Sequence, residues 1–180
     1  MHMSAAHEKH VGQTPEEVGS QLLVVRCTRE LLERVATPAT DEDKSTTALG
    51  DWFAQQVIVA EKPYILMVSR NSRLPLLIPG HGVDDIVAGL APALEKLLVA
   101  LDVAPESIRH EVAQCGDIVF SSGDVSSVRA SANDFARRIA VLIADQPELD
   151  STEVESILSE IPLKTLGFAL PSEATRRLLE

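Results

Sequence analysis

WFAQQVIVAEKPYILMVSRNSRLPLLIP, residues 52–79, holds three runs of apolar and β-branched residues that are typical of β-strands. The runs cover residues 52–60, 63–70 and 73–79. Only two residues separate each run from the next, whereas a parallel crossover needs about a dozen. The three runs therefore predict an antiparallel meander.

The composition of the second and third runs predicts their places in the sheet. Residues 64–68, YILMV, are continuously apolar, which favours the middle strand of the meander with both faces buried. Pro75 and Pro79 place the third strand at an edge or at a bulge, because proline has no N–H to donate to a neighbouring strand.

The segment before the meander contains a strand, a helix and a loop by the same criteria. QLLVVRC, residues 21–27, predicts a strand, and residues 28–35 predict a short helix with Thr28 as its N-cap. Residues 36–48 hold proline, threonine, serine and acidic residues without periodicity, so we expect a loop there.

After the meander the apolar residues recur every three or four positions, which predicts helices. We expect a short helix and then a new helix with Pro92 in its first turn, because a proline inside a helix costs about 3 kcal/mol. A further helix is expected to start at Pro105 and end near Gly116, and residues 117–123 predict another strand.

Residues 127–144 form the best helical pattern of the chain, and two shorter helices are expected after Pro147. In the first of the two, Thr152 and Glu155 have the spacing of a capping box. In the second, Ser172 is the expected N-cap.

These elements predict a single α+β domain, with an antiparallel or mixed sheet of about five strands covered by helices. Residues 1–19 are polar and aperiodic, and we expect a flexible N-terminal arm. Residues 20–146 are the expected α+β domain, and residues 147–180 are an expected C-terminal helical extension.

Charge and composition exclude several classes of function. The formal net charge is −11 and is spread along the chain, so binding to nucleic acid or to an anionic membrane is disfavoured. The chain shows neither a transmembrane run nor an apolar signal core, and we expect a cytoplasmic protein. Cys27 and Cys115 are expected to be reduced structural thiols. No cofactor and no metal is expected, since His7 and His10 lack a third ligand.

The start of the helix at 127–144 supplies the principal candidate site, which consists of Arg129, Ser131, Asn133 and Asp134. Two interpretations stay open. In one, the small residues let a neighbouring backbone approach, and Asn133 and Asp134 bond to groups that would otherwise be unsatisfied. In the other, the four residues line a polar pocket in which Arg129 is the cation.

Three weaker candidates lie in turns. Arg70 and Arg73 flank a turn and could hold a phosphate or a carboxylate, although a solvated hairpin explains them equally well. His81 stands between two glycines before a helix and could act as a general base, or it could belong to an ordinary turn from strand to helix. Residues 121–127 resemble an anion-binding loop in serine and glycine content but lack the spacing and the lysine of a P-loop.

Several segments together resemble an uncharacterised family of small bacterial domains known only as a domain of unknown function. The resemblance covers residues 21–144, and its marks are the strand at Trp52, the turn at Pro79, and the pattern that joins Ser127-Val128 to Asn133-Asp134-Phe135. The sequence departs from the family at Ser126, where an arginine is usual, and at Arg129-Ala130, where Leu-Gly is usual. The resemblance implies that the polar helix start is a feature of the domain, and it implies no substrate.

Two functions fit these observations. The first is a non-enzymatic cytoplasmic interaction or regulatory module that binds a protein partner or a second copy of itself, since catalytic motifs are missing and the tail segments are amphipathic. The second is a small-molecule or nucleotide-processing enzyme that uses Ser131, Asn133 and Asp134 with His81 or an arginine.

Overall fold

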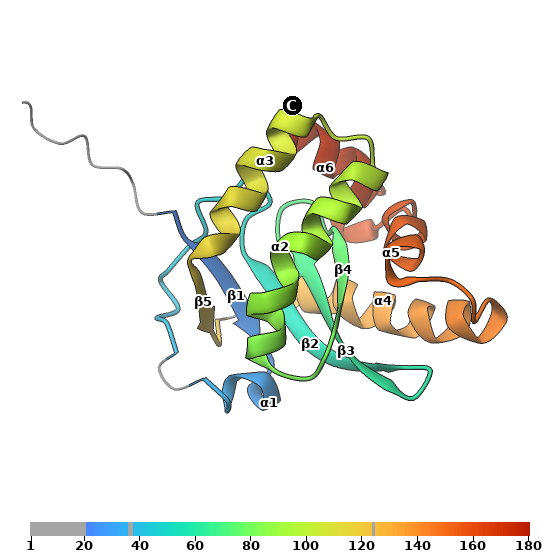
Figure 1. Ribbon diagram of the computed structural model, residues 1–180, viewed down its shortest axis with the longest axis horizontal. Helices are drawn as coiled ribbons and strands as arrows, with labels where there is room; N and C mark the ends of the chain where they lie inside the picture. Colours follow the sequence, from blue (N-terminus) through green and yellow to red (C-terminus); the bar gives the residue numbers. More distant parts are fainter. Residues whose placement is uncertain (1–20, 36–37, 124) are drawn as a thin grey trace, which may run out of the picture.

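The computed structural model describes residues 21–35, 38–123 and 125–180, which form a five-stranded sheet with helices on both faces (Figure 1). The α+β class expected from the sequence is confirmed. The expected N-terminal arm, residues 1–19, lies outside the described residues, as do His7 and His10.

The sheet is mixed, and its strand order is β4-β3-β2-β1-β5. The strands are β1 (Leu23–Cys27), β2 (Trp52–Val59), β3 (Lys62–Ser69), β4 (Pro75–Pro79) and β5 (Ile118–Ser121). The predicted meander is confirmed, because β3 lies antiparallel to both β2 and β4. Strand β4 is at the edge of the sheet, as its prolines predicted.

Strand β1 is parallel to both β2 and β5. Each parallel neighbour is reached by a long connection, as the geometry requires. The chain between β1 and β2 carries helix α1 (Arg29–Leu32) and the loop before Trp52, and the chain between β4 and β5 carries two longer helices. Thr28 is the N-cap residue of α1, although its side chain makes no capping hydrogen bond.

The helices form two layers, one on each face of the sheet (Figure 1). Helices α2 (Val83–Ala100) and α3 (Pro105–Ala113) cover one face, and a 3-10 helix, η1 (Gln114–Gly116), follows them. Helices α4 (Ser126–Asp145) and α5 (Ser151–Ser159) cover the other face. A second 3-10 helix, η2 (Lys164–Leu166), leads to α6 (Pro171–Leu179).

Alternating residues of the strands feed two cores. In β2, Trp52 and Ala54 pack toward α2, whereas Phe53 packs toward α4. The α4 core also takes Val154 and Leu158 from α5, so the segment after residue 146 contributes to the interior of the domain. The division of the chain at residue 146 stays a prediction.

The prediction of two helices around Pro92 is wrong, because α2 runs without a break from Val83 to Ala100. Its buried face includes Ile86 and Leu90 before the proline and Leu94 after it. Packing of this continuous face against the sheet outweighs the cost of one proline, about 3 kcal/mol. Gly89 gives the helix its close approach to the sheet, since a Cβ there would lie 2.7 Å from Ile78 Cγ2.

Both predicted caps of the tail helices are wrong. The N-cap of α5 is Asp150, which forms a capping box with Glu153, so Thr152 and Glu155 lie inside the helix. Asp150 and Glu153 have the same three-residue spacing as Thr152 and Glu155, and of the two glutamates only Glu153 is exposed. In α6, Pro171 occupies the first turn and Ser172 lies within the helix and is buried.

Candidate functional site

A buried ion pair links strand β1 to the residue before β2. The guanidinium of Arg26 lies 3.1 Å from Asp51 Oδ2 through both Nε and Nη2, and both side chains are almost fully buried. Arg26 Nη1 donates to Ser121 Oγ at 2.8 Å, and further donors of the guanidinium bond to the carbonyl oxygens of Asp41 and Asp43. All of these partners of Arg26 are residues of the same chain. The ion pair therefore ties the loop before β2 to the sheet.

Sequence reasoning missed Arg26 because it lies in an apolar run that was assigned only to a strand. A charge inside a buried strand is itself a signal, since buried charges are paired. Its partner could not be read from spacing, because Asp51 lies 25 positions away.

Of the two arginines in the β3–β4 turn, Arg70 lies beside this pair and Arg73 reaches the start of α4. Arg73 is 8% exposed, and its Nη2 donates to Ser127 Oγ at 3.2 Å. Its Nε is buried and has no hydrogen-bond partner. Burial and, to a lesser extent, the charge of Arg70 lower the pKa of the Arg73 guanidinium. Arg70 is half exposed and lies 3.6 Å from Asp51 Oδ2.

The four principal candidates on α4 make separate contacts. Ser131 is buried, and its hydroxyl lies 3.0 Å from Thr165 Oγ1 in η2. Arg129 is exposed, with its guanidinium carbon 5.6 Å from the centre of the Phe53 ring. Asn133 is exposed to solvent.

Asp134 pairs with two arginines of its own helix. Arg138 Nε lies 2.7 Å from Asp134 Oδ2, and Arg137 Nη2 lies 3.5 Å from Oδ1. The hydrogen bond from Arg138 is the main reason that the pKa of Asp134 lies below its ordinary value. Asp134 and Arg138 therefore form the favourable i, i+4 pair in which the acid precedes the base along the helix.

His81 lies apart from these groups. It follows the end of β4, whereas Arg73 precedes the start of that strand. The backbone N–H of His81 donates to Asp85 Oδ2, and its carbonyl oxygen accepts from Arg34 and Gln56. The structure brings Arg73 to the head of α4, and it does not bring His81 there.

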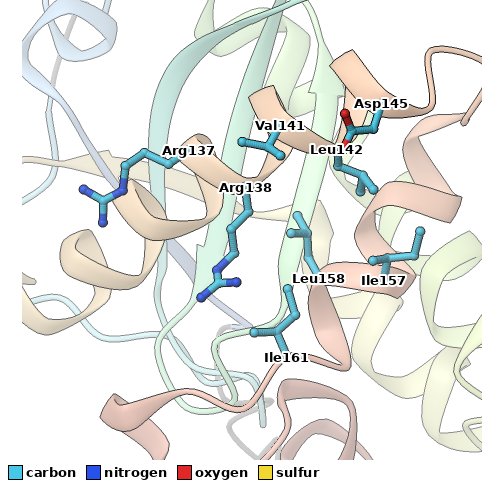
Figure 2. Close-up of a pocket in the computed structure, with 8 residues that line it drawn as sticks. All are labelled: Arg137, Arg138, Val141, Leu142, Asp145, Ile157, Leu158 and Ile161. Carbon is cyan, nitrogen blue, oxygen red and sulfur yellow. The ribbon is translucent and has the colours of Figure 1, made fainter.

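An open groove of about 380 Å³ lies between α4 and α5 (Figure 2). Its lining residues are Arg137, Arg138, Val141, Leu142, Asp145, Ile157, Leu158 and Ile161. The apolar side chains of α4 and of the α5 segment face each other across the groove, and Arg138 extends beside Leu158 toward Ile161 (Figure 2). Val141 is 63% exposed and Ile157 is 40% exposed, so the apolar walls are open to solvent.

The remaining reactive groups are buried or dispersed. Cys27 and Cys115 are free, and burial raises the pKa of each thiol to about 12, which disfavours the thiolate. Within residues 21–35, 38–123 and 125–180, no group of three histidine, cysteine, aspartate or glutamate side chains is placed to hold a metal. None of the described helices combines the length and apolarity that a membrane span requires.

A comparison with models of protein families shows to which family the chain belongs. Residues 24–174 match the model of DUF6933, a domain of unknown function. The chain belongs to this family. The DUF6933 match covers β1 except for Leu23, the other four strands and the helices from α1 to α5, so it includes both the arginine turn and the groove. It confirms the resemblance to a domain of unknown function, and no curated protein or solved structure matches the chain.

Proposed function

We propose that this DUF6933 protein is a non-enzymatic cytoplasmic interaction module that binds an acidic amphipathic helix of another protein in the α4/α5 groove. The observation that carries the proposal is the pair of exposed apolar walls, with Val141 on α4 and Ile157 on α5. Exposed apolar surface that is concave and rimmed by charge is typical of sites for partner helices.

The dimensions of the groove suit a short helix. Its α4 wall extends from Arg137 to Asp145, which is a little over two helical turns or about 12 Å. A partner helix of about three turns would place two apolar anchors, spaced three or four residues apart, between Val141 and Ile157. The two apolar anchors of the partner helix would bury the apolar surface that both walls of the groove expose to solvent.

The charge of the groove favours an acidic partner. Arg137 and Arg138 are both substantially exposed on the rim, and Asp145 stands at the other end. Both arginines pair with the single carboxylate of Asp134, which balances only one of their two positive charges, so this end of the groove keeps one positive charge that an acidic partner can meet. Complementary charge would raise the association rate and fix the direction of the bound helix.

Two observations support this hypothesis over an enzyme at the start of α4. The hydroxyl of Ser131 is engaged by Thr165, and the carboxylate of Asp134 is engaged by Arg137 and Arg138. The two buried free thiols support placement in the reducing cytoplasm.

Selection from a random peptide library on the immobilised protein tests the proposal. We expect enriched peptides to combine acidic residues with apolar residues at helical spacing, and to lose at least about tenfold in affinity on Val141→Asp. Val87→Asp is the matched control, because Val87 is 56% exposed on α2 and does not line the groove.

Enriched peptides that bind both variants as tightly as the wild type would overturn the proposal. So would a concentration-dependent dimer in sedimentation velocity that Val141→Asp alone abolishes, because the groove would then hold a second copy of this chain.

A further inference from the structure

Arg73 is a buried cation without a carboxylate partner among the described residues. Its side chain is 8% exposed, its Nη2 bonds to the neutral hydroxyl of Ser127, and its Nε has no partner. Arg26, the other buried arginine, pairs with Asp51. Burial of an unpaired charge is costly, and proteins ordinarily supply a counter-charge.

The turn that presents Arg73 is fixed by its own hydrogen bonds. The hydroxyls of Ser69 and Ser72 lie 2.8 Å apart, and Ser69 Oγ also accepts from the backbone N–H of Leu74 at 3.1 Å. The backbone N–H of Arg73 donates to the carbonyl oxygen of Ser69. These hydrogen bonds fix the turn, and the turn therefore holds the guanidinium of Arg73 against the first turn of α4.

The first turn of α4 adds positive potential where Arg73 already lies. The helix has 20 residues, its N-cap position is Val125, which makes no side-chain cap, and its first turn holds no acidic residue. The N-terminal end of a helix carries about half a positive charge.

Arg70 places a second cation at the same corner. Arg70 lies three residues before Arg73 in the same turn, and its charge contributes, after burial, to the lowered pKa of Arg73. The only carboxylate near Arg70 among the described residues is Asp51, at 3.6 Å, and Asp51 already pairs with Arg26 at 3.1 Å. Half of the Arg70 side chain is exposed, so it can turn toward a ligand.

We propose that Arg73, Arg70, Ser127 and the first turn of α4 form a binding site for a phosphate group. A phosphate dianion matches two guanidinia, a hydroxyl and a helix N-terminus in charge and in its number of acceptor oxygens. The ligand is either inorganic phosphate or the phosphate of a small monoester. The site lies at the opposite end of α4 from the Arg137–Asp145 groove wall, so it is independent of the proposed helix binding.

Isothermal titration of the full chain with inorganic phosphate and with ribose 5-phosphate, in a phosphate-free buffer, tests this site. We expect saturable binding that Arg70→Gln weakens at least about fivefold and Arg73→Gln at least about tenfold. Tighter binding of ribose 5-phosphate than of phosphate would identify a monoester as the ligand, and the reverse order would identify the free ion. Arg29→Gln is the control, because Arg29 is 89% exposed and lies in α1.

A second measurement keeps the test valid if Arg73→Gln fails to fold. In 15N–1H spectra of the wild type, bound phosphate is expected to shift the amide signals of Ser127, Val128 and Arg73. Absence of saturable binding to the wild type would overturn the proposal. Equal affinity of Arg70→Gln and Arg29→Gln, or shifts that leave these amides unmoved, would also overturn it.

Discussion

Glu155 on α5 accepts a hydrogen bond from the backbone N–H of Leu77, with 2.6 Å between Oε1 and the nitrogen. Leu77 belongs to the edge strand β4, whose outer N–H groups have no neighbouring strand. The carboxyl group thus satisfies a backbone donor that an edge strand would otherwise leave unpaired. Glu155 is 1% exposed, and burial raises its pKa to about 8.

The raised pKa of Glu155 predicts that the free energy of unfolding falls as the pH rises. The ordinary pKa of the group is 4.5, so between pH 4.5 and about 8 the folded state binds more protons than the unfolded state. Stability is lost across this window at up to about 1.4 kcal/mol per pH unit. Glu155→Gln keeps the acceptor without the charge, and urea unfolding at a series of pH values should show a flatter profile.

Exposed Glu148, substituted by glutamine, is the control for this experiment and should leave the pH profile of the wild type unchanged. Buried Glu111, whose pKa is also raised by burial, contributes a slope of the same sign in all three proteins. A Glu155→Gln profile as steep as that of the wild type would contradict the assignment.

Substitution of Arg26 by glutamine is expected to be strongly destabilising. It leaves buried Asp51 with only the more distant, half-exposed Arg70 as a counter-charge and removes the donor to Ser121, so a loss of about 3–5 kcal/mol is expected. Chemical denaturation measures this loss. Arg29→Gln, which breaks an exposed pair with Glu33, should stay within about 0.5 kcal/mol of the wild type. Similar losses in the two variants would mean that the buried pair does not organise the loop.

Gly89→Ala should destabilise the protein although alanine favours helices more than glycine does. The new methyl group would lie 2.7 Å from Ile78 Cγ2, and Ile78 is fully buried and has no room to retreat. Overpacking of this kind costs about 1–3 kcal/mol, against a gain in helix propensity of about 1 kcal/mol. A melting temperature above that of the wild type would show that α2 can move away from the sheet.

Pro92→Ala is expected to have the opposite effect in the same helix. Pro92 is exposed, and alanine would restore a backbone N–H in the interior of α2 and remove the clash of the ring with the preceding turn. A gain of up to about 3 kcal/mol in the free energy of unfolding is expected. An unchanged value would mean that α2 is already bent so as to accommodate the ring.

The elements of this fold could be predicted from sequence wherever one local pattern dominated. The meander followed from two-residue links, and α4 followed from the spacing of Val128, Ala132 and Phe135. The continuity of α2 could not be predicted, because it depends on how tightly the sheet accepts Gly89 and the apolar face around Pro92. The cap of α5 was missed because two overlapping stretches share one spacing.

The sequence could indicate which residues are suited to a site, but it could not indicate which of them the fold brings together. The turn arginines Arg70 and Arg73 could be named as anion ligands, but the contact of Arg73 with Ser127 joins positions 54 residues apart. The groove likewise exists only because α5 packs beside α4, and amphipathic patterns do not specify which helices become neighbours. Arg129, Ser131, Asn133 and Asp134 stay a predicted site, and their separate contacts favour structural roles for Ser131 and Asp134.

Mapping of a selected peptide onto the protein by 15N–1H chemical shifts tests the proposed interaction most directly. Binding in the groove predicts saturable shifts of the amide signals of its lining residues Arg138, Val141, Asp145, Ile157 and Ile161. Val141→Asp should abolish these shifts, and Val87→Asp should preserve them. Shifts confined to α2 and α3, or the same shifts in both variants, would contradict binding in the α4/α5 groove.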